Sequence, residues 1–127
     1  MTVRRVLMVC MGNICRSPTA EAVLRHKLDA AGLGETVTVD SAGTHAWHSG
    51  SPPDQRSTTH AARRGYSLAG LRAREVVEAD FDQFDLILAM DRENLRQLEQ
   101  RRPVGNTVRI ELFLGDREVP DPYFGAT

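Results

Sequence analysis

The stretch VRRVLMVCMGNICRSPTAEAV, residues 3–23, decides the fold, because it joins a strand pattern to a helix pattern through a short loop. The apolar run that ends at Val9 is rich in β-branched residues, as in a buried strand. After the loop, Ser17 is suited to cap a helix and Pro18 to occupy its first position. Apolar residues then recur at helical spacing up to Gly32, where we expect the helix to stop. The segment therefore predicts a strand, a loop and a helix in that order.

The rest of the chain continues this alternation of strand and helix patterns. In chain order we predict a strand over 36–40, a loop over 43–53, a helix over 54–64, a strand over 84–90, a helix capped by Asp91 that runs to about Arg101, a strand over 108–112 and a loop-like tail over 115–127. Such an order is typical of a parallel sheet with right-handed crossovers. We therefore predict one α/β domain over residues 1–127, with three layers: a four-stranded parallel sheet and helices on both faces.

Composition and charge exclude several classes of protein. Sixteen basic residues oppose seventeen acidic ones, and this near-neutral balance argues against a nucleic-acid partner. Neither a membrane-spanning run nor a secretory leader is evident, so we expect no membrane association and a cytoplasmic location. Two cysteines provide neither a disulfide framework nor a structural zinc site. We expect His45, His48 and His60 at the surface, and we predict no metal and no cofactor.

The loop after the first strand carries the predicted chemistry, because ligands of such sheets bind beyond the carboxyl ends of the strands. Cys10 and Arg16 are separated by five residues, and Gly12 and Asn13 between them tolerate left-handed backbone angles. The loop can therefore curl so that successive N–H groups and the start of the helix surround an oxyanion. Arg16 can offer its planar fork to a phosphate, and Cys10 beneath it would be held as a nucleophilic thiolate. We predict a phosphate-binding loop made of Met11, Gly12, Asn13, Ile14, Cys15, Arg16 and Ser17.

Two residues keep more than one interpretation on local sequence alone. Cys15 is either a small packing residue or a resolving thiol that forms a reversible disulfide with Cys10. Asp121 stands between two prolines, where it is either the proton donor for the leaving oxygen or an ordinary turn residue.

Five motifs in one order make the chain resemble the low-molecular-weight protein tyrosine phosphatases of bacterial type. They are VCMGNICRSPTAEAV at 9–23, DSAGT at 40–44, SPPDQR at 51–56, FDLILAMDRENL at 84–95 and DPYFG at 121–125. The resemblance implies hydrolysis of phosphotyrosine and small aryl phosphates through a phosphocysteine intermediate on Cys10. It implies that Arg16 binds the phosphoryl group and that Asp121 is the general acid and later the base.

The resemblance also implies supporting roles around the loop. Ser17 would hydrogen-bond the nucleophilic sulfur, Asn13 and Ser41 would hold the loop in shape, and Cys15 would be the redox partner of Cys10. The position of Ile14 favours phosphotyrosine, since arginine-phosphate phosphatases of this fold tend to carry Thr there.

Substrate recognition is a further implication of the resemblance. The walls of the substrate cleft would be Trp47, Tyr123 and Phe124, and Tyr123 is itself a candidate for phosphorylation. Expected partners are phosphotyrosine proteins, tyrosine autokinases among them, and inorganic phosphate or a similar oxyanion in the site. The family continues into a final helix that this sequence, ending at Thr127, does not include.

Three other functions compete with the phosphatase. An arsenate reductase on the same scaffold needs further thiols, and no cysteine follows Cys15. A phosphocysteine carrier has no use for the clamp of Arg16 or for a distant acid such as Asp121. An inactive binding module would require Cys10 to be unreactive.

Overall fold

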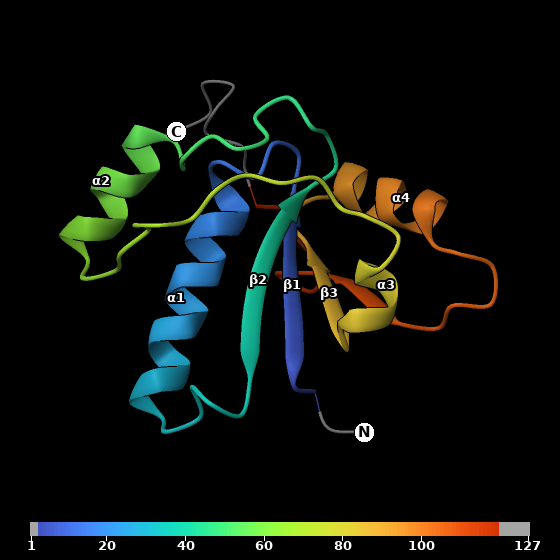
Figure 1. Cartoon of the computed structure of the whole chain (residues 1–127), viewed down its shortest axis with the longest axis horizontal. Coiled ribbons are helices and arrows are strands. Elements are labelled where there is room, and N and C mark those ends of the chain that lie inside the picture. The colour runs from blue at the N-terminus through green and yellow to red at the C-terminus, as the bar shows by residue number, and fades with distance from the viewer. Residues whose placement is uncertain (1–2, 120–127) are drawn as a thin grey trace.

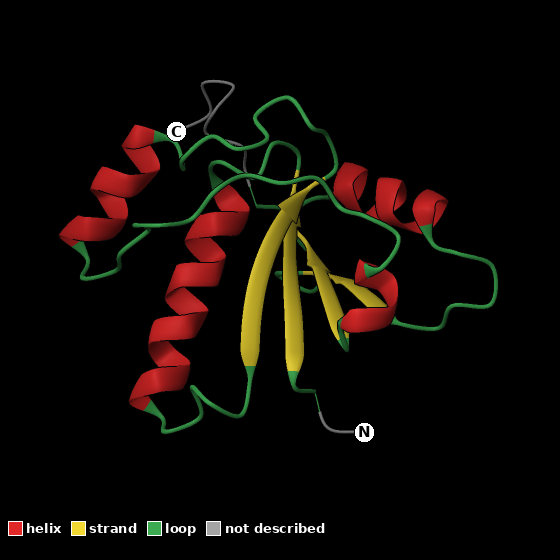
Figure 2. Ribbon diagram, in the orientation of Figure 1, coloured by secondary structure: helices red, strands yellow, loops and turns green. Residues whose placement is uncertain are grey.

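The computed structural model describes residues 3–119 and shows a parallel four-stranded sheet between helices (Figure 1, Figure 2). The elements are β1 (Arg5–Cys10), α1 (Arg16–Ala30), β2 (Thr38–Gly43), α2 (Gln55–Arg63), α3 (Asp80–Gln83), β3 (Leu86–Ala89), α4 (Arg92–Arg101) and β4 (Arg109–Leu112). The strands lie in the order β2-β1-β3-β4, and every neighbouring pair is parallel. The predicted α/β architecture is confirmed.

Strand β1 is central, and its alternate residues enter two different cores. Leu7 and Val9 belong to the core that includes Phe81 of α3 and Leu98 of α4. Val6, Met8 and Cys10 belong to the core against which the apolar side chains of α1 pack. A strand covered on both faces reads as one continuous apolar run, which explains the sequence pattern before Cys10. Cys10 is therefore the last strand residue on the α1 face.

Two helix boundaries, the end of α1 and the start of α4, follow the signals predicted from the sequence. The backbone of Gly32 is left-handed, with φ 78°, and the N–H of Leu33 returns to the carbonyl of Leu28 at 2.8 Å, which closes α1. Asp91 caps α4, and one of its carboxylate oxygens accepts from the backbone N–H of Asn94 at 2.7 Å. Both predictions are confirmed.

Three predictions need correction. Helix α1 begins at Arg16 with Cys15 as its N-cap, so Ser17 is not the cap; its hydroxyl lies 3.0 Å from the sulfur of Cys10 instead. Strand β2 extends beyond the predicted end to Gly43, because it pairs residue for residue with β1 up to Cys10. The four-residue helix α3 was not predicted, since one turn is too short to show a periodic pattern.

The segment between α2 and α3 crosses the ends of α1 and β2 (Figure 1). Gly43, the last residue of β2, donates to the carbonyl of Arg74 at 2.7 Å and accepts from the N–H of Val76 at 2.8 Å. On its other side Gly43 faces the loop after β1, where a Cβ would stand 2.7 Å from the carbonyl oxygen of Met11. A side chain at Gly43 would therefore force these backbones apart.

Across residues 3–119, no helix combines the length and the apolar character needed to cross a membrane.

A buried polar cluster ties α1 to β2. Glu21 of α1 is 2% exposed, accepts a hydrogen bond from Ser41 Oγ at 2.6 Å and is ion-paired with Arg25. Arg25 also donates to the carbonyl of Val39 at 2.6 Å. Burial raises the pKa of Glu21 above its usual 4.5, while the hydrogen bond from Ser41 and the charge of Arg25 oppose that rise.

This raised pKa gives a testable dependence of stability on pH. The folded protein holds the Glu21 proton more tightly than the unfolded chain does. The stability that this residue contributes is therefore greatest below pH 4.5 and falls as pH rises through the folded-state pKa. Glu21→Gln removes the titration, so its deficit in unfolding free energy should be largest near pH 4 and shrink towards about pH 7. Urea denaturation of both proteins across this range measures the difference, and a deficit that grows with pH would contradict the assignment.

Candidate active site

Cys10 lies at the carboxyl end of β1, beneath the first turn of α1. Its side chain is buried, with the residue 3% exposed, and its sulfur accepts a hydrogen bond from the backbone N–H of Asn13 at 3.2 Å. The hydroxyl oxygen of Ser17 is 3.0 Å from the same sulfur. The first N–H groups of a helix have no partners within it, and they carry the positive end of the helix dipole. The sulfur therefore lies where a negative charge is stabilised.

Asn13 holds the loop together. Its backbone is left-handed, with φ 58°, and it is the non-glycine residue with a positive φ within residues 3–119. Its side-chain nitrogen donates to Ser17 Oγ at 2.8 Å and to Ser41 Oγ at 2.9 Å. Its side-chain oxygen accepts from the backbone N–H of Arg74 at 3.0 Å. Because that N–H can only donate, the two ends of the amide are assigned unambiguously.

The donors and acceptors of this network fix the direction of each hydroxyl. Ser17 Oγ already accepts from Asn13, so its single proton is available to the sulfur of Cys10. Ser41 Oγ likewise accepts from Asn13 and donates to Glu21. Two donors thus converge on Cys10, and hydrogen bonds donated to a sulfur stabilise its thiolate.

Arg16 is the first residue of α1, and two groups accept hydrogen bonds from its guanidinium. It is 6% exposed, and its Nη1 donates both to Asp91 Oδ2 and to the carbonyl of Val119, each at 2.8 Å. Asp91 uses its other oxygen to cap α4, so a single carboxylate links that helix to the guanidinium. A guanidinium held in one orientation can present the N–H donors along its edge to two oxygens of a phosphate.

The chain that leads to Asp121 is anchored beside Arg16. The N–H of Val119 donates to the carbonyl of Met90 at 2.7 Å. Just before it, Glu118 accepts from the backbone N–H of Arg92 at the start of α4, at 2.8 Å. The three predicted site residues in the tail, Asp121, Tyr123 and Phe124, lie outside the described residues.

One rim of the site is the loop that follows β2. The N–H of Thr44 donates to the carbonyl of Cys10 at 2.9 Å, and the N–H of His45 donates to that of Met11 at 3.0 Å. These bonds attach the loop that carries Trp47, a residue 66% exposed, to the phosphate-binding loop. His48 packs against Gly12, where an added Cβ would be 2.9 Å from its ring.

Ile14 and Cys15 occupy the inner side of the loop. Both are buried and form a cluster with Ala73. The carbonyl of Ile14 accepts from the N–H of Asp54 at 2.7 Å, which joins the loop to the start of α2. Cys10 and Cys15 are both reduced and buried in this structure.

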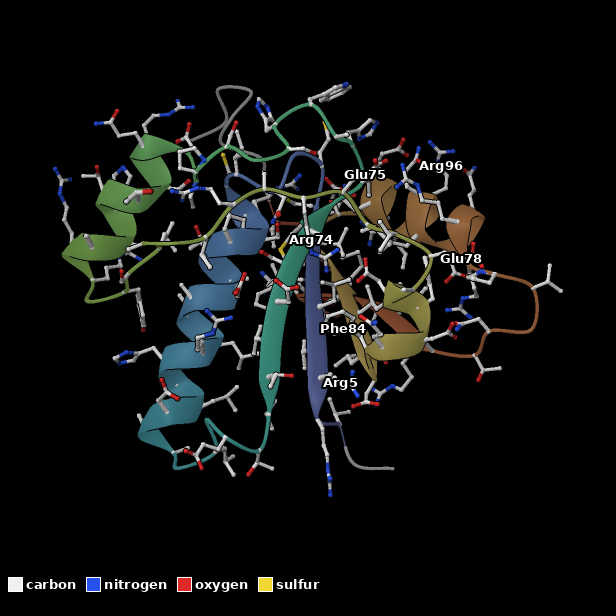
Figure 3. All side chains as sticks on the ribbon, in the orientation of Figure 1. Arg5, Arg74, Glu75, Glu78, Phe84 and Arg96 are labelled. Atoms are coloured by element: carbon white, nitrogen blue, oxygen red, sulfur yellow. The ribbon has the colours of Figure 1, made fainter. Side chains whose placement is uncertain are left out.

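Sequence reasoning missed Glu21 and Arg74 and recognised Asp91 only as a helix cap. Glu21 follows Ser17 by four residues, so the two share one face of α1, and a charge on that face is a signal that could have been used. Arg74, which is labelled in Figure 3, forms a bidentate ion pair with Asp80, at 2.9 and 3.1 Å. It also contacts Asp40 at 3.1 Å. These bonds hold the segment whose N–H receives Asn13, and no local pattern indicates them.

Comparison with known proteins agrees with this geometry. The sequence profile of the family described as low molecular weight phosphotyrosine protein phosphatase matches residues 5–127. A Synechocystis sequence is 48% identical over 129 residues, which cover 95% of this chain and 81% of that relative. The low molecular weight protein-tyrosine-phosphatase YfkJ of Bacillus subtilis is 44% identical over 125 residues, covering 94% of this chain and 80% of the relative.

The fold agrees equally well with a solved structure. The crystal structure of YfkJ superposes with a TM-score of 0.90 at 42% identity, over 98% of this chain and 82% of that one. A match over nearly the whole chain, in both sequence and structure, shows more than a shared fold. The chain belongs to the low molecular weight phosphotyrosine protein phosphatases, a family of protein-tyrosine-phosphatase enzymes.

Proposed function

We propose that the chain hydrolyses phosphotyrosine in proteins, and small aryl phosphates, through a phosphocysteine intermediate on Cys10. The observation that carries this proposal is the buried sulfur of Cys10, which lies at the start of α1 within reach of the N–H of Asn13 and the hydroxyl of Ser17. Hydrogen bonds donated to a sulfur stabilise the thiolate, which is the nucleophilic form of cysteine.

In the first step, the Cys10 thiolate attacks the phosphorus atom in line with the bond to the tyrosine oxygen. A sulfur–phosphorus bond forms while that phosphorus–oxygen bond breaks, and the oxygen leaves with the bonding electron pair. Arg16, held by Asp91, balances the charge on the phosphoryl oxygens, together with the N–H groups of the loop. Asp121 donates a proton to the leaving oxygen.

In the second step, Asp121 takes a proton from water as the water attacks phosphorus. The sulfur–phosphorus bond breaks, inorganic phosphate forms, and Cys10 leaves as a thiolate. The hydroxyl of Ser17 supports this departure, because it donates to the sulfur as negative charge returns to it.

The position of Val119 supports the role of Asp121. Its carbonyl already contacts Arg16, and two extended residues span at most about 7 Å. Asp121 follows Val119 by two residues, so the length of the chain allows its carboxylate to reach the phosphate-binding loop. An acid flanked by two prolines also has few backbone conformations to lose on ordering.

Aromatic walls support the choice of a phosphotyrosine substrate. Trp47 lies on the loop at the rim of the site, and Tyr123 and Phe124 are the other proposed walls of the substrate cleft. Walls of this kind pack against the phenyl ring of phosphotyrosine. The proposed substrates are therefore phosphotyrosine proteins, tyrosine autokinases among them. A relative of known structure, 35% identical, is described as a Drosophila arginine phosphatase, and phosphoarginine is therefore the competing substrate to test. Another solved relative is described in complex with benzylphosphonate, an aryl analogue of the kind expected here.

Cys15 is proposed as the redox partner that protects Cys10 through a reversible disulfide.

Hydrolysis of two aryl phosphates across pH tests the two chemical roles. The parent should turn over p-nitrophenyl phosphate in mildly acidic buffer, and Cys10→Ser should be inactive, because it lacks the thiolate. Asp121→Asn should lose on the order of 10²- to 10⁴-fold in kcat/KM for phenyl phosphate, because kcat/KM reports the first step, in which the leaving oxygen is protonated. The loss should be smaller for p-nitrophenyl phosphate, because its leaving group is a weaker base and depends less on protonation.

Three outcomes would contradict the proposal when the assay is extended to a labelled substrate, phosphotyrosine and phosphoarginine. If the parent, given a substrate with a radiolabelled phosphate, accumulates labelled phosphate on Cys10 without turnover, the protein is a phosphate carrier. A parent that prefers phosphoarginine to phosphotyrosine is an arginine phosphatase. Equal losses of kcat/KM for both aryl phosphates in Asp121→Asn would show that Asp121 is not the general acid.

Two substitutions at Asn13 separate its backbone from its side chain. Asn13→Gly and Asn13→Ala both remove the hydrogen bonds to Ser17 and Ser41, so each should lose on the order of 10²-fold in kcat/KM. Only the alanine retains the strain of a left-handed backbone, so it should unfold more easily than the glycine variant by roughly 1 kcal/mol. Phosphatase kinetics and urea denaturation measure the two effects. Parent-like activity in Asn13→Gly would show that the loop needs the backbone angle and not the network.

A further inference from the structure

His45 and Trp47 form a stack on the rim of the site that the proposed mechanism does not use. Their ring centroids are 4.3 Å apart and their planes differ by 25°. Trp47 is 66% exposed, and a surface indole without a packing partner samples several rotamers. The ring of His45 therefore gives the indole a defined orientation.

The stack has a rigid base. The Nδ1 atom of His45 lies 2.9 Å from the hydroxyl of Thr44, a fully buried residue at the end of β2. Thr44 is joined through its N–H to the carbonyl of Cys10, and its own carbonyl accepts from Arg101 of α4. Three contacts thus tie Trp47 to the backbone of Cys10: the ring stack, the contact of His45 with the Thr44 hydroxyl, and the hydrogen bond from the Thr44 N–H.

We propose that His45 is a positioning residue for the substrate: it holds Trp47 in place as a preformed aromatic wall beside the phosphate-binding loop. This inference rests on the proposed function, in which Trp47 faces the phenyl ring. One face of the indole packs on the imidazole, and in this proposal the opposite face of the exposed ring meets the substrate. A wall ordered before binding lowers the entropic cost of binding an aryl ring. His45 therefore acts on KM for aryl substrates and not on the chemical step.

Three variants test the stack. His45→Ala removes the ring, His45→Phe retains an aromatic face without a titrating nitrogen, and His60→Ala is the matched control, an exposed histidine on α2. Trp47 is the single tryptophan of the chain, so its fluorescence reports on this position alone. Acrylamide quenching should rise in His45→Ala and remain at the parent level in His45→Phe and in the control.

Kinetics with a phosphotyrosine peptide test the role in binding. His45→Ala should raise KM by roughly two- to tenfold, the factor that an aromatic pair contributes beyond its buried area, with kcat unchanged. His45→Phe should restore the parent KM. The inhibition constant of inorganic phosphate should be the same in every variant, because phosphate contacts only the loop and Arg16.

Three other outcomes would each contradict a different part of this proposal. Unchanged quenching and KM in His45→Ala would show that the stack does not position Trp47. A parallel rise in the phosphate inhibition constant would show that His45 shapes the loop itself. A parent that neither binds phosphate nor hydrolyses the peptide would overturn the proposed function and with it the substrate role, while the fluorescence still decides whether the stack exists.

Discussion

The site depends on the left-handed backbone of Asn13 and on the three hydrogen bonds that its buried amide makes. A left-handed backbone costs a non-glycine residue about 1–2 kcal/mol. Each hydrogen bond contributes about 0.5–1.5 kcal/mol, so three of them offset the strain. Glycine would adopt the same backbone at lower cost, but it would leave Ser17 and Ser41 without their donor. Asparagine combines tolerance of this backbone with a side chain that holds the neighbouring elements.

Those three partners come from separate parts of the chain. Ser17 belongs to α1, Ser41 to β2, and the N–H of Arg74 to the segment that crosses the end of β2. The loop therefore takes its shape only when the helix, the sheet and the crossing segment are in place. Gly43 makes this possible, because its lack of a Cβ lets the loop approach β2 while its backbone pairs with the crossing segment. The geometry around Cys10 is thus a product of tertiary folding and not of the local motif alone.

This dependence explains which features the sequence could predict. The strand before Cys10 and the caps at Asp91 and Gly32 follow from patterning and local backbone chemistry, and the structure confirms them. The predicted cap at Ser17 was wrong, because the sulfur of Cys10 competes for the hydroxyl and holds it inside the first turn. The ion pair of Asp91 with Arg16 spans 75 residues, and no local pattern encodes it.

The chemistry of the amide also separates the buried carboxyl of Glu21 from the hydroxyl that donates to Cys10. A hydroxyl can reverse its hydrogen bond, so a chain built only of hydroxyls would transmit a change at Glu21 to Cys10. The nitrogen of Asn13 has two hydrogens and accepts nothing, so it donates to Ser17 and to Ser41 independently. Protonation of Glu21 can turn the hydroxyl of Ser41, but it cannot turn that of Ser17, which still receives its bond from Asn13. The donor to the nucleophile is therefore insulated from the buried acid, although only two side chains lie between them.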